Sequence, residues 1–303
     1  MPDLAVLYEH PRWLLPLFAA LDARGVEYVA MDIGGHRFDP ASRDVPAPIV
    51  FNRVAMSSFL RADDHPIFYA ASLLARWQDA GARIVNGPAA LAFDTSKARQ
   101  IALMADLGIA TPRTLAVHRA ADVRAAAEAI GFPLIVKANI GGSGANITRY
   151  DDAAALAAAV GERTLPQSID RVLLVQDYVP ARGGVTTRVE TLGGKFLYAI
   201  DVAGSGDSFD LCLADVCAAP GKLSMAATVP PPEIVAGVES IAAAMALDVG
   251  GIEYMIDDRD GVPRFYDINA LSNFVADPLP LLGYDPHERL VDFLVDAIAE
   301  SGA

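Results

Sequence analysis

Two carboxylates and one amide near the end of the chain have the types and spacing of ligands for a hard metal ion. Asp267 and Asn269 lie two residues apart on the apolar run RFYDIN, so both side chains leave the same face of a predicted strand. Glu253 lies on the preceding apolar run, and the DDRDG segment between the runs predicts a hairpin turn. Converging carboxylate and amide oxygens suit Mg²⁺ that also holds phosphates. These residues therefore predict a nucleotide-dependent enzyme.

A lysine followed by glycines predicts a phosphate contact. Lys137 lies near the end of the apolar strand PLIVKA and precedes a loop containing Gly141, Gly142, Ser143 and Gly144. Glycines allow backbone N–H groups to approach an anion, and a lysine beside them supplies a point charge. A solvated lysine before a flexible turn would show the same pattern, and no GKS or GKT completes a Walker A motif.

Other polar positions are ambiguous by themselves. Lys97 lies in the first turns of a predicted helix, where Asp94 is expected as the N-cap and the lysine would usually be exposed. Arg188 lies on the strand TTRVE and would usually be a surface residue. The acidic residues of the DDRDG turn are expected to be solvated and are assigned no chemistry; they are Asp257, Asp258 and Asp260.

The first third of the chain alternates strand and helix patterns, which predicts a small parallel sheet. The expected strands are Leu4–Tyr8, Val26–Met31, Pro48–Phe51 and Ala82–Val85, and the expected helices are Trp13–Arg24 and Phe68–Ala80. No GxGxxG turn follows the first strand, so a dinucleotide-binding fold is not supported.

The remaining two thirds mix amphipathic helices with apolar strands. The expected helices are Thr95–Leu107, Ala120–Ile130, Asp152–Val160, Glu233–Leu247 and Glu288–Glu300. A strand reading VLLVQDYV ends in the polar segment Gln176–Val179, and a hairpin is expected over Thr187–Val202 with its turn at Gly193 and Gly194.

The composition limits the class of protein. A chain of 303 residues with 53% hydrophobic residues should form two or three compact units. No apolar run has the length of a membrane span and no secretory signal is visible, so we expect a cytoplasmic protein. The formal charge of −14 argues against a nucleic-acid partner. The two cysteines, Cys212 and Cys217, match no disulfide scaffold or zinc motif and are expected to be small buried side chains.

The order of these residues resembles the ATP-grasp superfamily, and within it the carboxylate–amine ligases of the ribosomal-S6-modifying and glutathione-synthetase-like branch. The resemblance extends from Val85 onward, and NGPAALAFDTSKARQIALMADLGIATPRT is the most family-like run. It implies an α/β fold in which a small parallel-sheet domain precedes a two-lobed ATP-grasp module. The implied domains are 1–93, the central lobe with the glycine-rich loop at 94–180, and the C-terminal lobe with the metal site at 181–303.

The resemblance also implies roles for individual residues. Lys97 and Lys137 would contact the phosphates of ATP, and the loop Gly141–Gly144 would close over them. The segment Gln176, Asp177, Tyr178 and Val179 would form the hinge that offers backbone groups to adenine. Arg188 would face the transferring phosphoryl group, so that Arg188 and Lys137 are the expected catalytic residues. Two Mg²⁺ ions, or Mn²⁺ in their place, would be held by Glu253, Asp267 and Asn269.

The implied reaction activates a carboxylate as an acyl phosphate and joins it to an amine, with release of ADP and phosphate. Two alternatives stay open: an ATP-grasp carboxylase or kinase that acts on another nucleophile, and a non-catalytic nucleotide-binding protein. The expected partners are a small carboxylic acid and an amine, and exposed apolar faces on the first domain would permit a homodimer.

The chain departs from the family pattern at two positions that concern substrates. Thr186 and Thr187 precede Arg188 where an acidic residue is common, so Asp177 is the substitute expected to contact ribose. The family ending Asn-x-x-Ser-Pro-Gly is replaced by the residues 269–274, NALSNF, so the identity of the acceptor cannot be carried over. The segment Gly204–Asp210 and the pair Asn52 and Arg53 are expected either to contact substrate or to be a plain loop and strand end.

Overall fold

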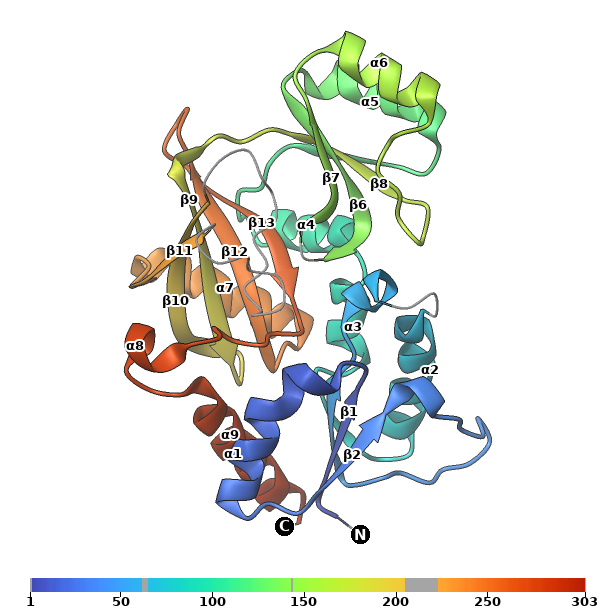
Figure 1. Cartoon of the computed structure of the whole chain (residues 1–303), viewed down its shortest axis with the longest axis vertical. Helices are drawn as coiled ribbons and strands as arrows, with labels where there is room; N and C mark the ends of the chain where they lie inside the picture. The colour runs from blue at the N-terminus through green and yellow to red at the C-terminus, as the bar shows by residue number, and fades with distance from the viewer. Residues whose placement is uncertain (1, 62–64, 143, 205–222, 303) are drawn as a thin grey trace.

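The protein is described by a computed structural model that covers residues 2–61, 65–142, 144–204 and 223–302. In these residues the chain forms three sheets that follow one another along the sequence (Figure 1). The first sheet is parallel and the other two are antiparallel. The predicted α/β class, with a parallel sheet at the N-terminus, is confirmed.

The first sheet has the strand order β2-β1-β3-β4. Its strands are β1 (Leu4–Tyr8), β2 (Tyr28–Asp32), β3 (Ile49–Arg53) and β4 (Arg83–Val85). The connecting helices are η1 (Pro11–Leu14), α1 (Leu15–Arg24), η2 (Ile33–Gly35), η3 (Met56–Leu60), α2 (Pro66–Asp79) and α3 (Pro88–Asp94). Strands β1 and β3 are almost fully buried because helices cover both faces of the sheet, which explains their continuous apolar sequences.

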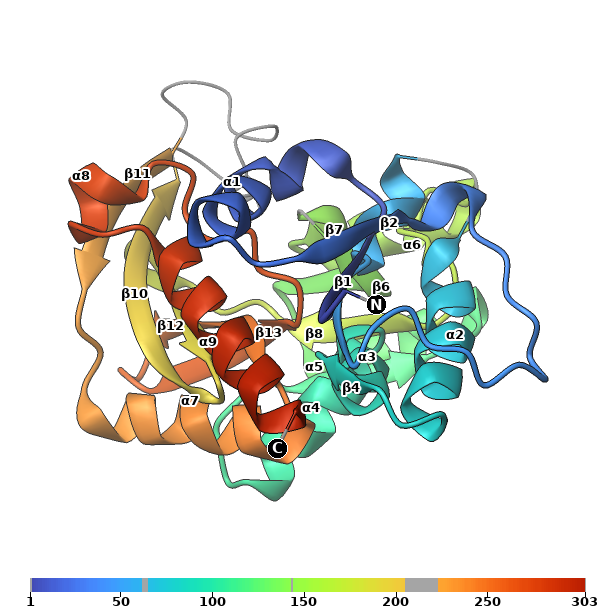
Figure 2. The same ribbon diagram turned by 90° about the horizontal axis from the view of Figure 1, so that it is seen from below.

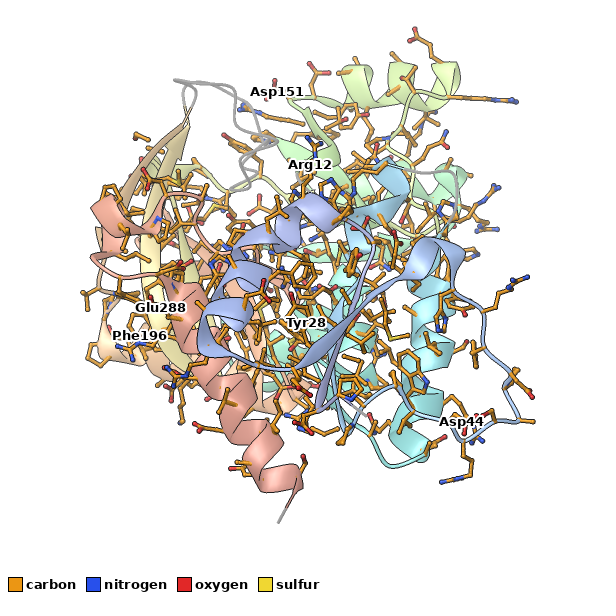
Figure 3. The ribbon with its side chains drawn as sticks, turned by 60° about the horizontal axis from the view of Figure 1, so that its bottom comes forward. Arg12, Tyr28, Asp44, Asp151, Phe196 and Glu288 are labelled. Atoms are coloured by element: carbon orange, nitrogen blue, oxygen red, sulfur yellow. The ribbon has the colours of Figure 1, made fainter. Side chains whose placement is uncertain are left out.

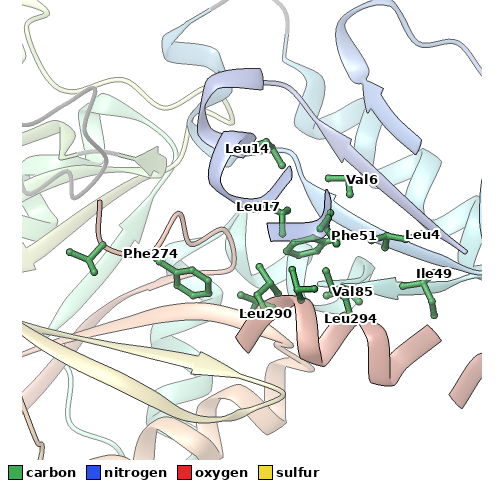
Figure 4. Close-up of a cluster of buried hydrophobic side chains, with 14 of the residues drawn as sticks. Leu4, Val6, Leu14, Leu17, Ile49, Phe51, Val85, Phe274, Leu290 and Leu294 are labelled. Carbon is green, nitrogen blue, oxygen red and sulfur yellow. The ribbon is translucent and has the colours of Figure 1, made fainter. Parts of the chain in front are cut away.

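The last helix, α9 (Pro286–Ser301), returns to the first sheet and lies beside α1 (Figure 2). Leu290 and Leu294 of α9 belong to the same buried cluster as Leu4 and Phe51 of the sheet (Figure 4). The end of the chain is therefore part of the core that supports the N-terminal sheet.

The second sheet has the order β5-β8-β6-β7 and follows helix α4 (Lys97–Asp106). Its strands are β5 (Thr114–Val117), β6 (Leu134–Gly142), β7 (Ala145–Tyr150) and β8 (Leu173–Asp177). The turn η4 (Ala120–Asp122) leads into α5 (Val123–Ile130), which packs with α6 (Ala153–Glu162) on this sheet. The alanines of these helices allow close packing on the sheet.

The third sheet has the order β11-β10-β9-β12-β13. Its strands are β9 (Ala181–Leu192), β10 (Lys195–Gly204), β11 (Leu223–Thr228), β12 (Val249–Asp257) and β13 (Pro263–Asn269). Helix α7 (Pro232–Met245) packs against it through Val238 and Ile241, and the short α8 (Pro278–Leu282) lies near β11. This sheet carries the predicted metal ligands on its β12–β13 hairpin.

Several elements differ from expectation. Strand β9 begins six residues before the expected Thr187, and β6 continues through Gly142 where a loop was expected. Helix α3 and strand β11 were not predicted, because each is short and lacks a clear period in the sequence. The three domain boundaries stay a prediction, although each sheet lies inside one of the three ranges.

Charged side chains project from the surface at many places, among them Asp44, Asp151 and Glu288 (Figure 3). Exposed apolar side chains on the first domain include Leu15 and Phe68, and the homodimer stays a prediction. Among the described residues, no helix is both long and apolar enough to cross a membrane. Cys212 and Cys217 lie outside these residues.

Candidate active site

A cleft of about 430 Å³ opens between the three sheets. One wall is formed by the β6–β7 hairpin and the segment that joins β8 to β9. The opposite wall is formed by β9, β12 and β13, and the residues from Leu271 to Phe274 close one end together with η3 of the first domain. Most of the residues singled out in the sequence line this cleft, although they are spread over about 170 positions of the chain.

The three predicted metal ligands lie together on the β12–β13 hairpin. Glu253 pairs with Asp267 in the strand register, and the Asn269 Nδ2 atom lies 3.3 Å from Glu253 Oε1 and 3.4 Å from Asp267 Oδ2. Burial raises the pKa of Glu253. For Asp267, burial is outweighed by the charges of two neighbouring lysines, which lower the pKa. The ligand role of these residues stays a prediction.

The two predicted phosphate-binding lysines are buried in the cleft instead of solvated. Lys97 is 5% exposed and forms an ion pair with Asp267. Lys137 is 4% exposed, and its Nζ donates a 3.5 Å hydrogen bond to the carbonyl oxygen of Tyr266. Burial, together with the nearby charge of Lys97, lowers the pKa of Lys137 to about 8. Two buried cations beside the carboxylates form a site for a polyanion.

The expected N-cap of helix α4 is wrong. Asp94 is the last residue of α3, and Ser96 caps α4 by accepting a hydrogen bond from the Arg99 N–H. Asp94 is instead 2% exposed, and its Oδ1 accepts a 2.9 Å hydrogen bond from the N–H of Ala270. Burial raises the pKa of Asp94 to about 6. Its carboxyl group therefore holds the end of β13 and the segment that follows.

The glycine-rich segment forms the tip of the β6–β7 hairpin. Gly141 and Gly142 end β6, and Gly144 has a φ of 70° directly before β7, whereas Ser143 lies outside the described residues. A Cβ atom on Gly142 would lie 2.5 Å from the Cβ of Ser57 in η3. The hairpin tip thus packs closely against the first domain. Its closure over phosphates stays a prediction.

The predicted hinge leads from β8 into β9. Gln176 is buried and donates a 2.7 Å hydrogen bond to Thr114, while Tyr178 and Val179 follow the end of the strand and line the cleft. Asp177 pairs with Arg259 of the β12–β13 turn at 2.7 Å. The carboxylate that was expected to contact ribose is thus paired with an arginine in this structure. The contact between Asp177 and ribose stays a prediction.

Of the three acidic residues expected in a solvated turn, Asp258 and Asp260 are exposed as expected, whereas Asp257 ends β12 and is buried. Asp257 is fully buried and accepts hydrogen bonds from Arg259 and Arg264. The hydrogen bonds from Arg259 hold the pKa of Asp257 well below its usual range. The Asp258 N–H donates to the carbonyl oxygen of Pro180, so the turn is fixed to the hinge.

Arg188 occupies the centre of the cleft wall. Its Nε contacts Glu190 at 2.6 Å and its Nη1 contacts Glu253 at 2.9 Å. Although burial alone would lower the pKa of Arg188, the two carboxylates raise it. Gly251 lies directly beneath the guanidinium, because a Cβ there would come within 2.5 Å of Arg188 Cζ. The sequence analysis missed Glu190, whose signal is the Arg-x-Glu spacing that places both side chains on one face of β9.

The first domain contributes the end of the cleft. Trp13 lines it, with the His10 ring tilted against the indole at a centroid distance of 4.4 Å and the guanidinium of Arg61 at 4.4 Å from the ring. Arg53 is buried and reaches the segment after β13, but it is not among the residues that line the cleft, so its contact with substrate stays a prediction. The side chain of its neighbour Asn52 forms a hydrogen bond within the first domain, where its Oδ1 accepts from the N–H of Val54. Of the expected segment Gly204–Asp210, only Gly204 is described, and it lines the cleft.

A comparison with known protein families shows to which family the chain belongs. The RimK-like ATP-grasp domain matches residues 94–274, which is more than half of the chain and contains the residues placed above from Lys97 to Phe274. The chain belongs to the RimK-like ATP-grasp family. The resemblance inferred from the order of the lysines, the arginine and the metal ligands is confirmed.

Curated relatives of this RimK-like chain include a ribosomal protein bS6–L-glutamate ligase from Shigella boydii serotype 4 (strain Sb227), 26% identical over 204 residues. The match covers 67% of this chain and 64% of the relative, so the chain spans less than two thirds of the length of that relative. A counterpart from Escherichia coli O139:H28 (strain E24377A / ETEC) is 25% identical over the same length.

Solved structures share the RimK-like fold over nearly the whole chain. The ATP-grasp ligase PsnB in complex with a minimal precursor has a TM-score of 0.70 at 20% identity, covering 98% of this chain and 99% of that one. PsnB has also been solved with a phosphomimetic precursor variant, Mg and ADP, with a TM-score of 0.71 at 19% identity over 98% and 100% of the chains. The D-alanine–D-alanine ligase from Bacillus anthracis in complex with ATP has a TM-score of 0.69 at 14% identity, covering 98% and 96%. At these identities the likeness shows the fold alone.

The donor atoms of this RimK-like cleft fit a hard divalent cation. In the part of the chain that the structure describes, no group of three or more His, Cys, Asp or Glu side chains could hold a metal, and the side chain beside Glu253 and Asp267 is the amide of Asn269, whose Nδ2 atom faces the two carboxylates. If the amide turned over, its oxygen would join the two carboxylates in a donor set that suits Mg²⁺ together with phosphate oxygens and water. Lys97 now neutralises Asp267 and would have to shift toward a phosphate when a cation binds.

Proposed function

We propose that this protein is an ATP-dependent ligase that activates a carboxylate as an acyl phosphate and joins it to an amine. The observation that carries the proposal is the convergence of two buried lysines and Arg188 on Glu253 and Asp267 in one cleft. Phosphoryl transfer needs positioning and charge neutralisation more than covalent catalysis, and this cleft supplies both.

The nucleotide would lie along the cleft with its base at the hinge. Tyr178 and Val179 would border adenine, and Lys97 and Lys137 would contact the phosphates. Bound Mg²⁺, which we expect as two ions or as Mn²⁺ in their place, would neutralise phosphate charge and would be held by the side chains Glu253, Asp267 and Asn269. The hairpin tip at residues 141–144 would exclude water from the activated intermediate.

The reaction would proceed in two displacements. A carboxylate oxygen attacks the γ-phosphorus, and the bond to the bridging oxygen breaks with its electron pair passing to ADP. Arg188, which lies beside Glu253 in the cleft, would neutralise the phosphoryl group during this step. The amine nitrogen then attacks the acyl carbon, phosphate leaves with the electron pair of the broken C–O bond, and the nitrogen loses a proton.

The relatives support a ligase and leave the substrates open. One group is named for ribosomal protein bS6 and L-glutamate, and PsnB is solved with a precursor peptide. For this chain we propose a small carboxylic acid and an amine, and we expect the reaction in the cytoplasm, where ATP is supplied.

The test is ADP release from ATP and Mg²⁺ across pools of carboxylic acids and amines. Release should require both an acid and an amine, and Asp267→Asn should lower it by about 10²–10³-fold because the cation that neutralises the phosphates would lose a charged ligand. Asp106→Asn, which removes an exposed carboxylate from the end of α4, is the matched control and should leave the rate unchanged. Release that needs bicarbonate instead of an amine would favour a carboxylase, and failure to bind a non-hydrolysable ATP analogue would refute the proposal.

A further inference from the structure

The segment that follows β13 is held to the first domain by one buried arginine. Arg53 at the end of β3 is 5% exposed, and its Nη1 donates a 2.6 Å hydrogen bond to the carbonyl oxygen of Ser272. Its Nη2 donates a 2.7 Å hydrogen bond to Oδ1 of Asn273. These two contacts join positions about 220 residues apart in the sequence and fix both the backbone and one side chain of the segment.

The next residue anchors the segment from the other side. Phe274 has a φ of 55°, a left-handed conformation that is uncommon for a bulky residue. Its ring is 3% exposed and packs near Leu290 of α9 in the core of the first sheet (Figure 4). Burial of the ring in this core compensates for the unfavourable backbone. Asn273 is thus held between a buried arginine and a buried aromatic ring.

The contact with Arg53 determines which way the amide of Asn273 points. A guanidinium can only donate hydrogen bonds, so the amide atom that faces it has to be the oxygen. The Nδ2 group, with two donor hydrogens, is therefore on the opposite side of the amide. Asn273 lines the cleft, and no hydrogen bond from its Nδ2 is found within the described ranges of the chain.

The residue before Asn273 lies next to the arginine of the proposed reaction centre. The Nη2 of Arg188 lies 3.4 Å from Oγ of Ser272, the residue directly before Asn273.

We propose that the Asn273 amide donates a hydrogen bond to the acyl oxygen of the acid substrate, opposite Arg188, and that Arg53 is the residue that positions it. This inference rests on the ligase function proposed above and names the substrate group that this end of the cleft binds. The acyl oxygen gains negative charge when the amine attacks, and a fixed donor is most effective where charge develops. The ligand class is a carboxylate and the acyl phosphate made from it.

The test uses a stable analogue of the acyl phosphate. In acetonylphosphonate a methylene group replaces the ester oxygen of acetyl phosphate, so that the phosphoryl group cannot be transferred. Its binding to the enzyme with saturating Mg²⁺ and ADP would be measured by calorimetry for the wild type and for Asn273→Asp. Aspartate keeps an oxygen for Arg53 and so preserves the anchor, but it replaces the donor by an anionic acceptor. Gln167→Glu, an amide-to-acid change at an exposed position, is the matched control.

We expect Asn273→Asp to bind acetonylphosphonate about 10- to 100-fold more weakly, because one hydrogen bond to a charged group is lost and a repulsion replaces it. Its affinity for Mg²⁺ and ADP and its melting temperature should equal those of the wild type. A purely structural role of Asn273 would not predict weaker binding of the analogue at an unchanged melting temperature. Arg53→Lys, which cannot form both hydrogen bonds to Ser272 and Asn273, should weaken the binding of the analogue to a smaller extent.

Three results would count against these ideas at different levels. Equal binding of the analogue by Asn273→Asp and wild type would show that Asn273 only anchors the segment. A wild type that binds Mg²⁺ and ADP but not the analogue would overturn the subsite and leave the ligase proposal standing. A wild type that does not bind Mg²⁺ and ADP would overturn the proposed function, and the subsite with it.

Discussion

Replacing the buried carboxyl group of Asp94 by an amide should make the protein more stable at neutral pH. Asp94 is 2% exposed, and burial raises its pKa from 3.8 to about 6, even though the Ala270 N–H and the charge of Lys97 act to lower it. Its ionised form is therefore disfavoured in the folded protein and accommodated freely in the unfolded chain.

The size and sign of the effect follow from linkage between protonation and folding. The pKa of Asp94 is higher in the folded protein than in the unfolded chain. Its contribution to the free energy of unfolding is therefore fully present below pH 3.8 and is lost as the pH rises through about 6. At about 1.4 kcal/mol for each pH unit between the two values, the loss for Asp94 is on the order of 3 kcal/mol above pH 6. Asp94→Asn has no charge to lose, and its side-chain oxygen can still accept from Ala270 N–H.

The measurement is urea unfolding, followed by circular dichroism, at pH values from 4 to 8. The difference in unfolding free energy between Asp94→Asn and the wild type should grow from pH 4 to pH 6 and stay constant above that. Asp106→Asn, which removes an exposed carboxylate of the same helical region, should run parallel to the wild type. If Asp94→Asn also runs parallel across the whole range, Asp94 is not a strained buried acid and the argument fails.

Two glycines should be intolerant of alanine for different reasons. Gly251→Ala would place a methyl group on the guanidinium of Arg188, so we expect at least about a tenfold loss of ADP release. Gly237→Ala in α7 is the control and should be active, because the nearest atom to its added methyl group would lie at 3.7 Å. A fully active Gly251→Ala would show that Arg188 can move without loss of activity. Gly142→Ala would press on Ser57 of η3 and should lower the unfolding free energy by about 1–3 kcal/mol in a urea titration. A Ser57→Gly change in the same chain should restore most of that loss, and an additive effect of the two changes would contradict the contact.

The sequence was informative where chemistry depends on strand alternation. Asp267 and Asn269 were placed on one face by their spacing, and Glu253 was placed opposite them by a hairpin that the turn residues predicted. The parallel sheet was predictable because β1 and β3 are apolar at nearly every position, as buried strands must be.

Other features depend on contacts between distant segments, for which one sequence has no signal. Asp257 looked like a solvated turn residue because its burial depends on two arginines that fold over it. Lys97 looked like an exposed helix residue because its partner Asp267 lies 170 positions away. The hydrogen bond from Arg53 to the segment after β13 likewise joins the first domain to a segment that follows the last sheet.

The ion pair between Arg259 and Asp177 joins the hinge to one end of the β12–β13 hairpin, whose strands carry Glu253 and Asp267 further along. Asp257 lies four positions after Glu253 along the extended strand, a span of about 13 Å. That length is set by backbone geometry and is insensitive to side-chain motion. The hairpin therefore holds the end that is bound to the hinge at a fixed distance from its two acidic side chains.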